Sequence, residues 1–82
     1  MSVYPRVFVT RLSDTVDDSI LHEFFSRWVS VRWARLAREP DGTSKNYGFV
    51  EVETEQDAKT ALELDQYELH GRRIIVRPAK TK

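Results

Sequence analysis

The sequence predicts an α+β sandwich whose elements follow in the order βαββαβ. Short runs of β-branched and aromatic residues recur four times along the chain. Two segments with helical spacing of apolar residues lie between them, and each follows a Ser/Thr-x-x-acid pattern typical of a helix start. This order is that of the ferredoxin-like fold, a four-stranded antiparallel sheet with both helices on one face.

The length and composition of the chain restrict what it can be. Its 82 residues are expected to form one domain over residues 1–82, with a core between about residues 6 and 79. Hydrophobic residues make up 40% of the chain, which suffices for one core but not also for a deep cavity. The absence of Cys excludes a disulfide scaffold, thiolate metal ligands and cysteine catalysis. No apolar run approaches the roughly 20 residues of a membrane span, and the start of the chain has no signal-peptide pattern.

The first strand and the first helix occupy the start of the chain. The strand is predicted at Val7–Val9, between Pro5 and the polar pair Ser13-Asp14. Thr15 and Asp18 then have the spacing of a capping box, which predicts the start of a helix. The apolar residues that follow share one helical face: Ile20, Leu21, Phe24, Phe25 and Trp28.

Two strands joined by a short loop come next. They are predicted at Val31–Arg38 and at Tyr47–Val52. Between them, Glu39–Gly42 has the chemistry of a turn, because proline presets φ and glycine tolerates positive φ. We therefore expect a hairpin.

The second helix and the fourth strand complete the order. Thr54 and Asp57 form another capping box, and a helix with an apolar face is expected behind it. Its apolar residues are Ala58, Ala61, Leu62 and Leu64. The fourth strand is predicted at Ile74–Val76, entered through Gly71 and closed by Pro78.

One face of the predicted sheet has no helix to cover it, and we call it the open face. Side chains alternate along a strand, so residues of one parity share a face. If the valines of the strands face the helices, the outward residues are Phe8, Thr10, Trp33, Arg35, Ala37, Lys45, Tyr47, Phe49, Glu51, Arg73, Ile75 and Arg77. Exposed rings among Arg and Lys suit single-stranded nucleic acid, because bases stack on rings and cations meet phosphates. Trp33 has a second interpretation, in which it only covers an edge of the sheet.

Two segments on this face resemble the signatures of the RNA recognition motif, also called the ribonucleoprotein domain. The longer signature runs Lys/Arg, Gly, aromatic, Gly/Ala, aromatic, aliphatic, any, aromatic, and it is similar to Lys45-Asn46-Tyr47-Gly48-Phe49-Val50-Glu51-Val52. The shorter one runs aliphatic, aromatic, aliphatic, any, Asn, Leu, and it is similar to Val7-Phe8-Val9-Thr10-Arg11-Leu12. The resemblance extends from about Arg6 to Ala79.

The resemblance implies roles for particular residues. In the family, the aromatic of the shorter motif and the two central aromatics of the longer one stack on bases or sugars, which here implies Phe8, Tyr47 and Phe49. The first position of the longer motif, here Lys45, typically contacts phosphate. Family members also use the fourth strand and the segment after it, which here implies Arg73, Ile75, Arg77, Lys80 and Lys82.

Several positions depart from the family pattern. Asn46 replaces a glycine, and Asn tolerates unusual backbone angles better than most residues. Arg11 replaces the usual Asn of the shorter motif, where it would add a phosphate contact and alter the local turn. Val29 stands where Gly often follows the first helix, and Asp65-Gln66 replaces a common Asn-Gly. Val52 replaces an aromatic, but parity places it in the core.

The predicted function is non-catalytic binding of single-stranded RNA, or of single-stranded DNA, in RNA processing or mRNA metabolism. Arg35, Arg73 and Arg77 would hold phosphates or base edges. No enzyme activity, cofactor or metal is expected, because His22 and His70 lie far apart and no nucleophile with a base at suitable spacing is visible. We expect a monomeric domain of a longer protein, without a membrane partner, in the nucleus, the cytoplasm or an RNA-containing organelle.

The alternative function is a protein-interaction module. Around the first helix, Asp14, Asp17, Asp18 and Glu23 offer an acidic surface to a basic partner protein. The two functions can coexist, since they would use opposite faces.

The distribution of charge agrees with binding on the sheet. The chain carries 13 Lys+Arg against 13 Asp+Glu, a net charge of zero. The strand segments and the C-terminal tail (6–12, 31–38, 45–53, 72–82) hold 11 basic and 2 acidic residues, a net of +9, and the rest of the chain balances it. Not all of these cations point to the open face; Arg32 and Arg72 are two that parity does not place there. The sequence therefore predicts a polarised domain with a shallow salt dependence of binding.

Overall fold

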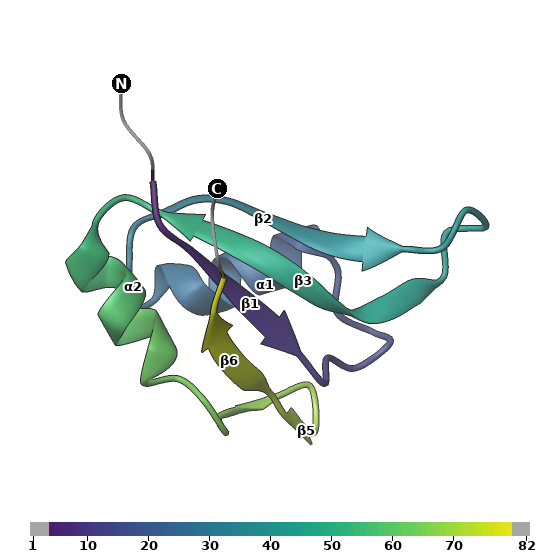
Figure 1. Cartoon of the computed structure of the whole chain (residues 1–82). Coiled ribbons are helices and arrows are strands. Elements are labelled where there is room, and N and C mark those ends of the chain that lie inside the picture. The colour runs from purple at the N-terminus through teal and green to yellow at the C-terminus, as the bar shows by residue number, and fades with distance from the viewer. Residues whose placement is uncertain (1–3, 80–82) are drawn as a thin grey trace.

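A computed structural model describes residues 4–79 of the chain. The helices and strands are β1 (Arg6–Thr10), α1 (Asp18–Ser26), β2 (Val31–Arg38), β3 (Ser44–Val52), α2 (Glu55–Leu62), β4 (Glu68–Leu69), β5 (Arg72–Arg73) and β6 (Ile75–Pro78). The main sheet is antiparallel with strand order β2-β3-β1-β6 (Figure 1). The predicted βαββαβ fold is confirmed, with a small β4–β5 hairpin added before the last strand.

The core lies between the sheet and the two helices. Helix α1 contacts β2, and α2 contacts β1, β3 and β6. The alternation of buried and outward residues on the strands is the expected one, since Val7, Val9, Val50 and Val52 are all fully buried. The helices contribute mainly Leu21, Phe24, Phe25, Ala58 and Ala61. In residues 4–79 no helix is long and apolar enough to cross a membrane.

Helix α1 begins later than its predicted capping box. Asp17 is the N-cap, and its carboxylate accepts a hydrogen bond from the Ile20 N–H at 2.9 Å. The prediction of Thr15 as the cap was wrong: its hydroxyl contacts Nδ1 of His70 at 2.8 Å instead. Asp18 accepts from the Leu36 N–H on the outer edge of β2 at 2.7 Å. Asp caps a helix as well as Thr does, so the pattern alone did not distinguish the two starts.

The end of α1 also differs from the expectation. The helix stops at Ser26, and Trp28 follows outside it with 42% of its surface exposed. Trp28 therefore does not extend the apolar face into the core. Its ring packs at an angle on Phe24, with centroids 5.2 Å apart. The second capping prediction is confirmed, because the Thr54 hydroxyl accepts from the Asp57 N–H at 3.1 Å.

The predicted fourth strand is divided. Strand β6 pairs with β1 only from Ile75, while Arg72 and Arg73 form β5 and pair with β4. His70 and Gly71 have positive φ of 51° and 83°, which turns the chain back tightly between these two short strands. Arg73 therefore lies outside the main sheet, and its expected place on the open face was wrong.

Three of the residues that depart from the family pattern have left-handed backbones: Asn46, Arg11 and Gln66, the last with φ of 74°. Asn46 has φ of 65°, and its side-chain amide donates to the Leu12 carbonyl oxygen at 2.9 Å and to the Asp14 carboxylate at 2.7 Å. These bonds stabilise a conformation that Asn adopts more readily than most residues. Arg11 has φ of 63°, so the turn after β1 is indeed unusual for an arginine.

Candidate nucleic-acid interface

The four strands of the main sheet place aromatic and basic side chains beside one another on the open face. Phe8 lies opposite Phe49 across the β1–β3 pair, and Thr10 lies opposite Tyr47. On the other side of β1, Phe8 faces Arg77. Across the β2–β3 pair, Phe49 faces Arg35. The centre of the open face is therefore a row that runs Arg35, Phe49, Phe8, Arg77 from β2 to β6.

Phe8, Tyr47 and Phe49 form a compact cluster that we call the aromatic triplet. The ring centroids of Phe8 lie 5.5 Å from Tyr47 and 5.3 Å from Phe49, and those of Tyr47 and Phe49 are 6.4 Å apart. Phe49 is 37% exposed, although a phenylalanine is normally buried. The triplet thus presents tilted, partly open rings to the solvent, which is the arrangement on which nucleic-acid bases can stack.

The basic residues predicted around the triplet differ in whether they already have an acidic partner. Arg35, Lys45 and Arg11 are exposed, and within residues 4–79 no carboxylate lies at ion-pair distance from them. Arg77 is paired with Asp65 at 3.1 Å. Arg73 is exposed on β5, apart from the row. Lys80 and Lys82 lie outside the described residues.

Ile75 and Trp33 lie at the borders of the triplet. Ile75 is opposite Thr10 on β6 and is half-buried. Trp33 is opposite Glu51 on β3 and is also half-buried. The guanidinium of Arg6 lies 5.2 Å from the Trp33 ring centroid, and that of Arg35 lies 5.6 Å from it. Trp33 therefore belongs to the open face and is already in contact with two cations.

A charged cluster beside Trp33 was not predicted, and we call Arg6, Arg32 and Glu51 the Glu51 cluster. Nε of Arg6 donates to Oε1 of Glu51 at 3.0 Å, and Nε of Arg32 donates to Oε2 at 2.9 Å. Glu51 is only 7% exposed. Burial opposes ionisation of Glu51, but the two arginine hydrogen bonds outweigh it and lower the pKa of its carboxyl.

A β-bulge explains why parity failed for Arg32. Val31 lies opposite Val52, but Trp33 lies opposite Glu51, so β2 has one residue more than β3 over this stretch. The extra residue directs Arg32 to Glu51, whereas parity placed it away from the open face. Nothing in the sequence marks this bulge, because neither glycine nor proline occurs in Val31–Arg38.

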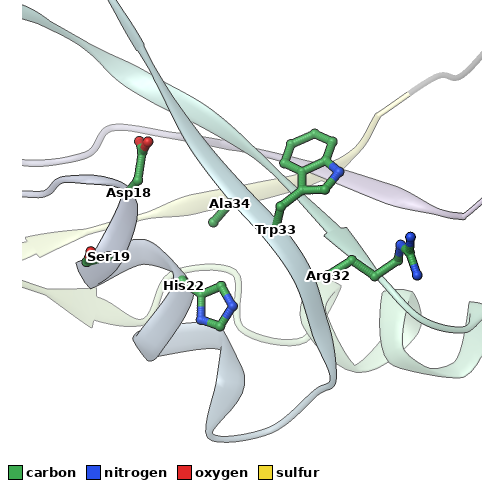
Figure 2. A pocket seen from close by; sticks show the side chains of 6 residues that line it. All are labelled: Asp18, Ser19, His22, Arg32, Trp33 and Ala34. Carbon is green, nitrogen blue, oxygen red and sulfur yellow. The ribbon is translucent and has the colours of Figure 1, made fainter.

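A groove lies between α1 and the outer edge of β2, beside the open face rather than on it. Its volume is about 350 Å³, and Asp18, Ser19 and His22 line it on the helix side (Figure 2). His22 contacts the Ser26 hydroxyl of its own helix at 3.2 Å. Among residues 4–79 no group of three acidic or histidine side chains could hold a metal ion.

The fold and the aromatic triplet on the two central strands match what the two strand motifs predicted. The chain belongs to the RNA recognition motif family, whose model matches residues 7–75. Domains of this family bind RNA without catalysis, through aromatic residues on the sheet. The resemblance noted in the two strand motifs is therefore confirmed.

The chain is similar to known proteins over nearly its whole length. It is 38% identical to polyadenylate-binding protein 4 of Arabidopsis thaliana over 74 residues, which are 89% of this chain and 11% of that protein. It is 33% identical to protein boule-like of Homo sapiens over 78 residues, 94% of this chain and 28% of that protein. The chain thus spans less than a third of the length of these relatives.

Solved structures show the same fold. The second RRM domain of a yeast poly(U)-binding protein superposes with a TM-score of 0.85 at 28% identity, covering 95% of this chain and 96% of that one. A structure of the first two RRM domains of the yeast protein gives a TM-score of 0.90 at 27% identity, covering 99% and 52% respectively.

Proposed function

We propose that this domain binds a short single-stranded RNA across the open face, as part of a longer protein that acts in RNA processing or mRNA metabolism. The observation that carries the proposal is the aromatic triplet, partly exposed on β1 and β3 in a chain of this family. Two relatives are named for binding poly(A) and poly(U), which supports RNA over DNA as the ligand. Such a protein would act where RNA is present, in the nucleus, the cytoplasm or an RNA-containing organelle.

The proposed mechanism divides stacking from charge. Phe8 and Tyr47 each stack a base, and Phe49 packs under a base or between sugars. Each stacked base contributes roughly 1–3 kcal/mol, and neighbouring contributions need not add. Arg35 and Lys45 would meet phosphates directly, because within residues 4–79 neither has an acidic partner to leave first.

Arg77, Arg11 and Arg73 would contribute less directly. Arg77 has to share its guanidinium with Asp65, because the two side chains already form an ion pair. Arg11 follows the end of β1, and Arg73 is on the neighbouring hairpin. Each would therefore contact only an RNA that is long enough to extend beyond the row.

The double variant Phe8→Ala/Phe49→Ala tests the proposal. RNA affinity should fall at least about 30-fold, since two stacking surfaces are removed while the core on the opposite face is untouched. Binding is measured by fluorescence anisotropy with labelled oligo(U) and oligo(A). Tyr67→Ala is the matched control, because Tyr67 is also an exposed aromatic, at 46%, but lies outside the sheet. Equal affinity of the double variant and the wild type would contradict binding on the triplet.

The helical side offers a second candidate function, docking of a basic protein segment. Trp28 and Tyr67 are 42% and 46% exposed, and their rings meet edge to face at 5.7 Å. Next to them lies a groove of about 230 Å³ between α1 and the β4–β5 hairpin. It is lined by apolar Ile20, Phe24 and Leu69, by acidic Glu23 and Glu68, and by Arg27 and His70.

The acids first expected to form this docking surface are mostly engaged inside the domain. Asp14 accepts from Asn46, Asp17 caps α1, and Asp18 binds the edge of β2. Only Glu23 remains part of the candidate. An NMR titration with short RNA separates the two functions: shifts confined to α1, α2 and Tyr67, with the triplet unchanged, would contradict sheet binding and favour the helical side.

A further inference from the structure

A buried carboxylate lies on the open face, next to the row of aromatic and basic residues. Glu51 lies on β3 to one side of this row, between Arg6 on β1 and Trp33 on β2. Among residues 4–79, Glu51 is the one charged residue that is buried. A fixed negative charge on a surface that meets phosphates repels the ligand, so its presence there needs a reason.

The contacts of Glu51 show what it does to its neighbours. Each carboxylate oxygen of Glu51 accepts from the Nε of a different arginine, Arg6 on β1 at 3.0 Å and Arg32 on β2 at 2.9 Å. The carboxylate is therefore held from two neighbouring strands. Arg6 also lies over the Trp33 ring, and Arg32 lies 3.6 Å from the centroid of the Tyr4 ring. A second acid, Glu53, approaches Arg32 at 3.7 Å.

The consequence is an uneven open face. At the Glu51 end, two guanidiniums are partly neutralised and held in place by the carboxylate and the rings. In the row itself Arg35 has no acidic partner within the described part of the chain, and neither has Lys45 on the other side of the row. Phosphates are therefore attracted to one end of the face more strongly than to the other.

We infer that Glu51 limits the RNA-binding surface by masking Arg6 and Arg32, so that a bound strand makes its phosphate contacts at the unpaired cations, Arg35 and Lys45, rather than at these two arginines. This inference rests on the proposed RNA binding and adds to it a residue that restricts where the strand lies. Glu51 is here a positioning residue, which acts through the two arginines rather than by touching RNA.

The test is Glu51→Gln, which keeps the size of the side chain and removes its charge. The released arginines become available to phosphate, and each phosphate contact on a single strand steepens the salt dependence. The slope of log affinity against log salt should therefore become steeper by about 0.7 to about 1.4 than in the wild type. It is measured by anisotropy with oligo(U) and oligo(A) of about four to ten nucleotides.

A length series gives a readout that a merely structural role of Glu51 would not change. Affinity of the wild type should level off at a shorter oligonucleotide than affinity of Glu51→Gln, because the variant can also hold phosphates at Arg6 and Arg32. A 1H–15N spectrum checks that the variant is folded. Both arginines are partly solvent-exposed, at 46% and 36%, so water can hydrate them after the change.

Two further variants assign the effect. Glu63→Gln removes an equal charge from the exposed end of α2 and leaves every contact of Arg6 and Arg32, so its slope should match the wild type. The triple variant Glu51→Gln/Arg6→Gln/Arg32→Gln should return the slope to the wild-type value. A steeper slope that persists in the triple variant would overturn the inference, as would an unchanged slope in Glu51→Gln.

The same measurements keep the two proposals distinguishable. If Phe8→Ala/Phe49→Ala abolishes binding and Glu51→Gln leaves slope and length dependence unchanged, only the role of Glu51 is wrong. If the Phe8→Ala/Phe49→Ala variant binds as tightly as the wild type, the proposed binding site is wrong, and with it the surface that Glu51 would limit.

Discussion

The absence of a side chain at Gly48 lets two strands of the sheet approach each other closely. Gly48 lies buried in β3, opposite Leu36. A Cβ placed there would overlap the carbonyl oxygen of Arg35 and lie 3.2 Å from the Leu21 side chain. Backbone cannot move aside as a flexible side chain can, so the close approach of β2 and β3 requires glycine at this position.

Gly48→Ala should therefore destabilise the domain by about 1–3 kcal/mol, the usual cost of overpacking a core. Urea denaturation followed by tryptophan fluorescence measures the change. The affected strand carries Tyr47 and Phe49, so any remaining folded protein should also show shifted amide signals along β3. An unchanged urea midpoint would contradict the close approach.

The residues of the candidate site were predictable to different degrees. Parity was enough to place Phe8, Tyr47, Phe49 and Arg35 on one face, because regular strands alternate without exception. It failed for Arg32, where a bulge shifts the register, and for Arg73, where a hairpin interrupts the strand. Both failures come from backbone irregularities that depend on packing between strands, which a single strand's sequence does not contain.

At the level of elements, helix starts were harder to predict than helix faces. The apolar stripe of α1 was recognisable from its spacing, but Thr15, Asp17 and Asp18 all precede it and each is able to cap a helix. The choice depends on tertiary contacts: Thr15 bonds His70, and Asp18 bonds the edge of β2. Asp17 is left to accept from the first turn of the helix.

This assignment predicts unequal effects of two alanine substitutions. Asp17→Ala removes the cap and should lower the free energy of unfolding by about 1 kcal/mol. Thr15→Ala removes only an exposed side-chain contact and should change it by less than about 0.5 kcal/mol. Urea denaturation of the two variants side by side checks the order. A larger loss for Thr15→Ala would mean that the helix starts at the earlier residue.

Over the whole molecule, carboxylates join elements that are distant in the sequence. Glu51 connects β3 to β1 and, through Arg32, to β2. Asp65, just after α2, accepts from the Val76 N–H at 2.9 Å and pairs with Arg77 on β6. The zero net charge of the chain therefore results from two arrangements. Some opposite charges form specific pairs across the sheet, and the remaining charges are segregated between strands and helices.

These pairs make the stability of the domain depend on pH in a defined direction. The Val76 N–H, and then Arg77, lower the pKa of Asp65 against the opposing effect of burial, and the pKa of Glu51 is lowered as well. A carboxyl with a lower pKa in the folded chain stabilises the fold above its ordinary pKa, 4.5 for Glu and 3.8 for Asp. That stabilising contribution is lost as the pH falls through the pKa of the folded chain.

Urea denaturation should thus give a constant free energy of unfolding from about pH 7 to about pH 5.5 and a decline below it. Glu51→Gln cannot lose the glutamate contribution, so its decline should be shallower, and a decline as steep as that of the wild type would show that the Arg6 and Arg32 pairs do not stabilise the sheet.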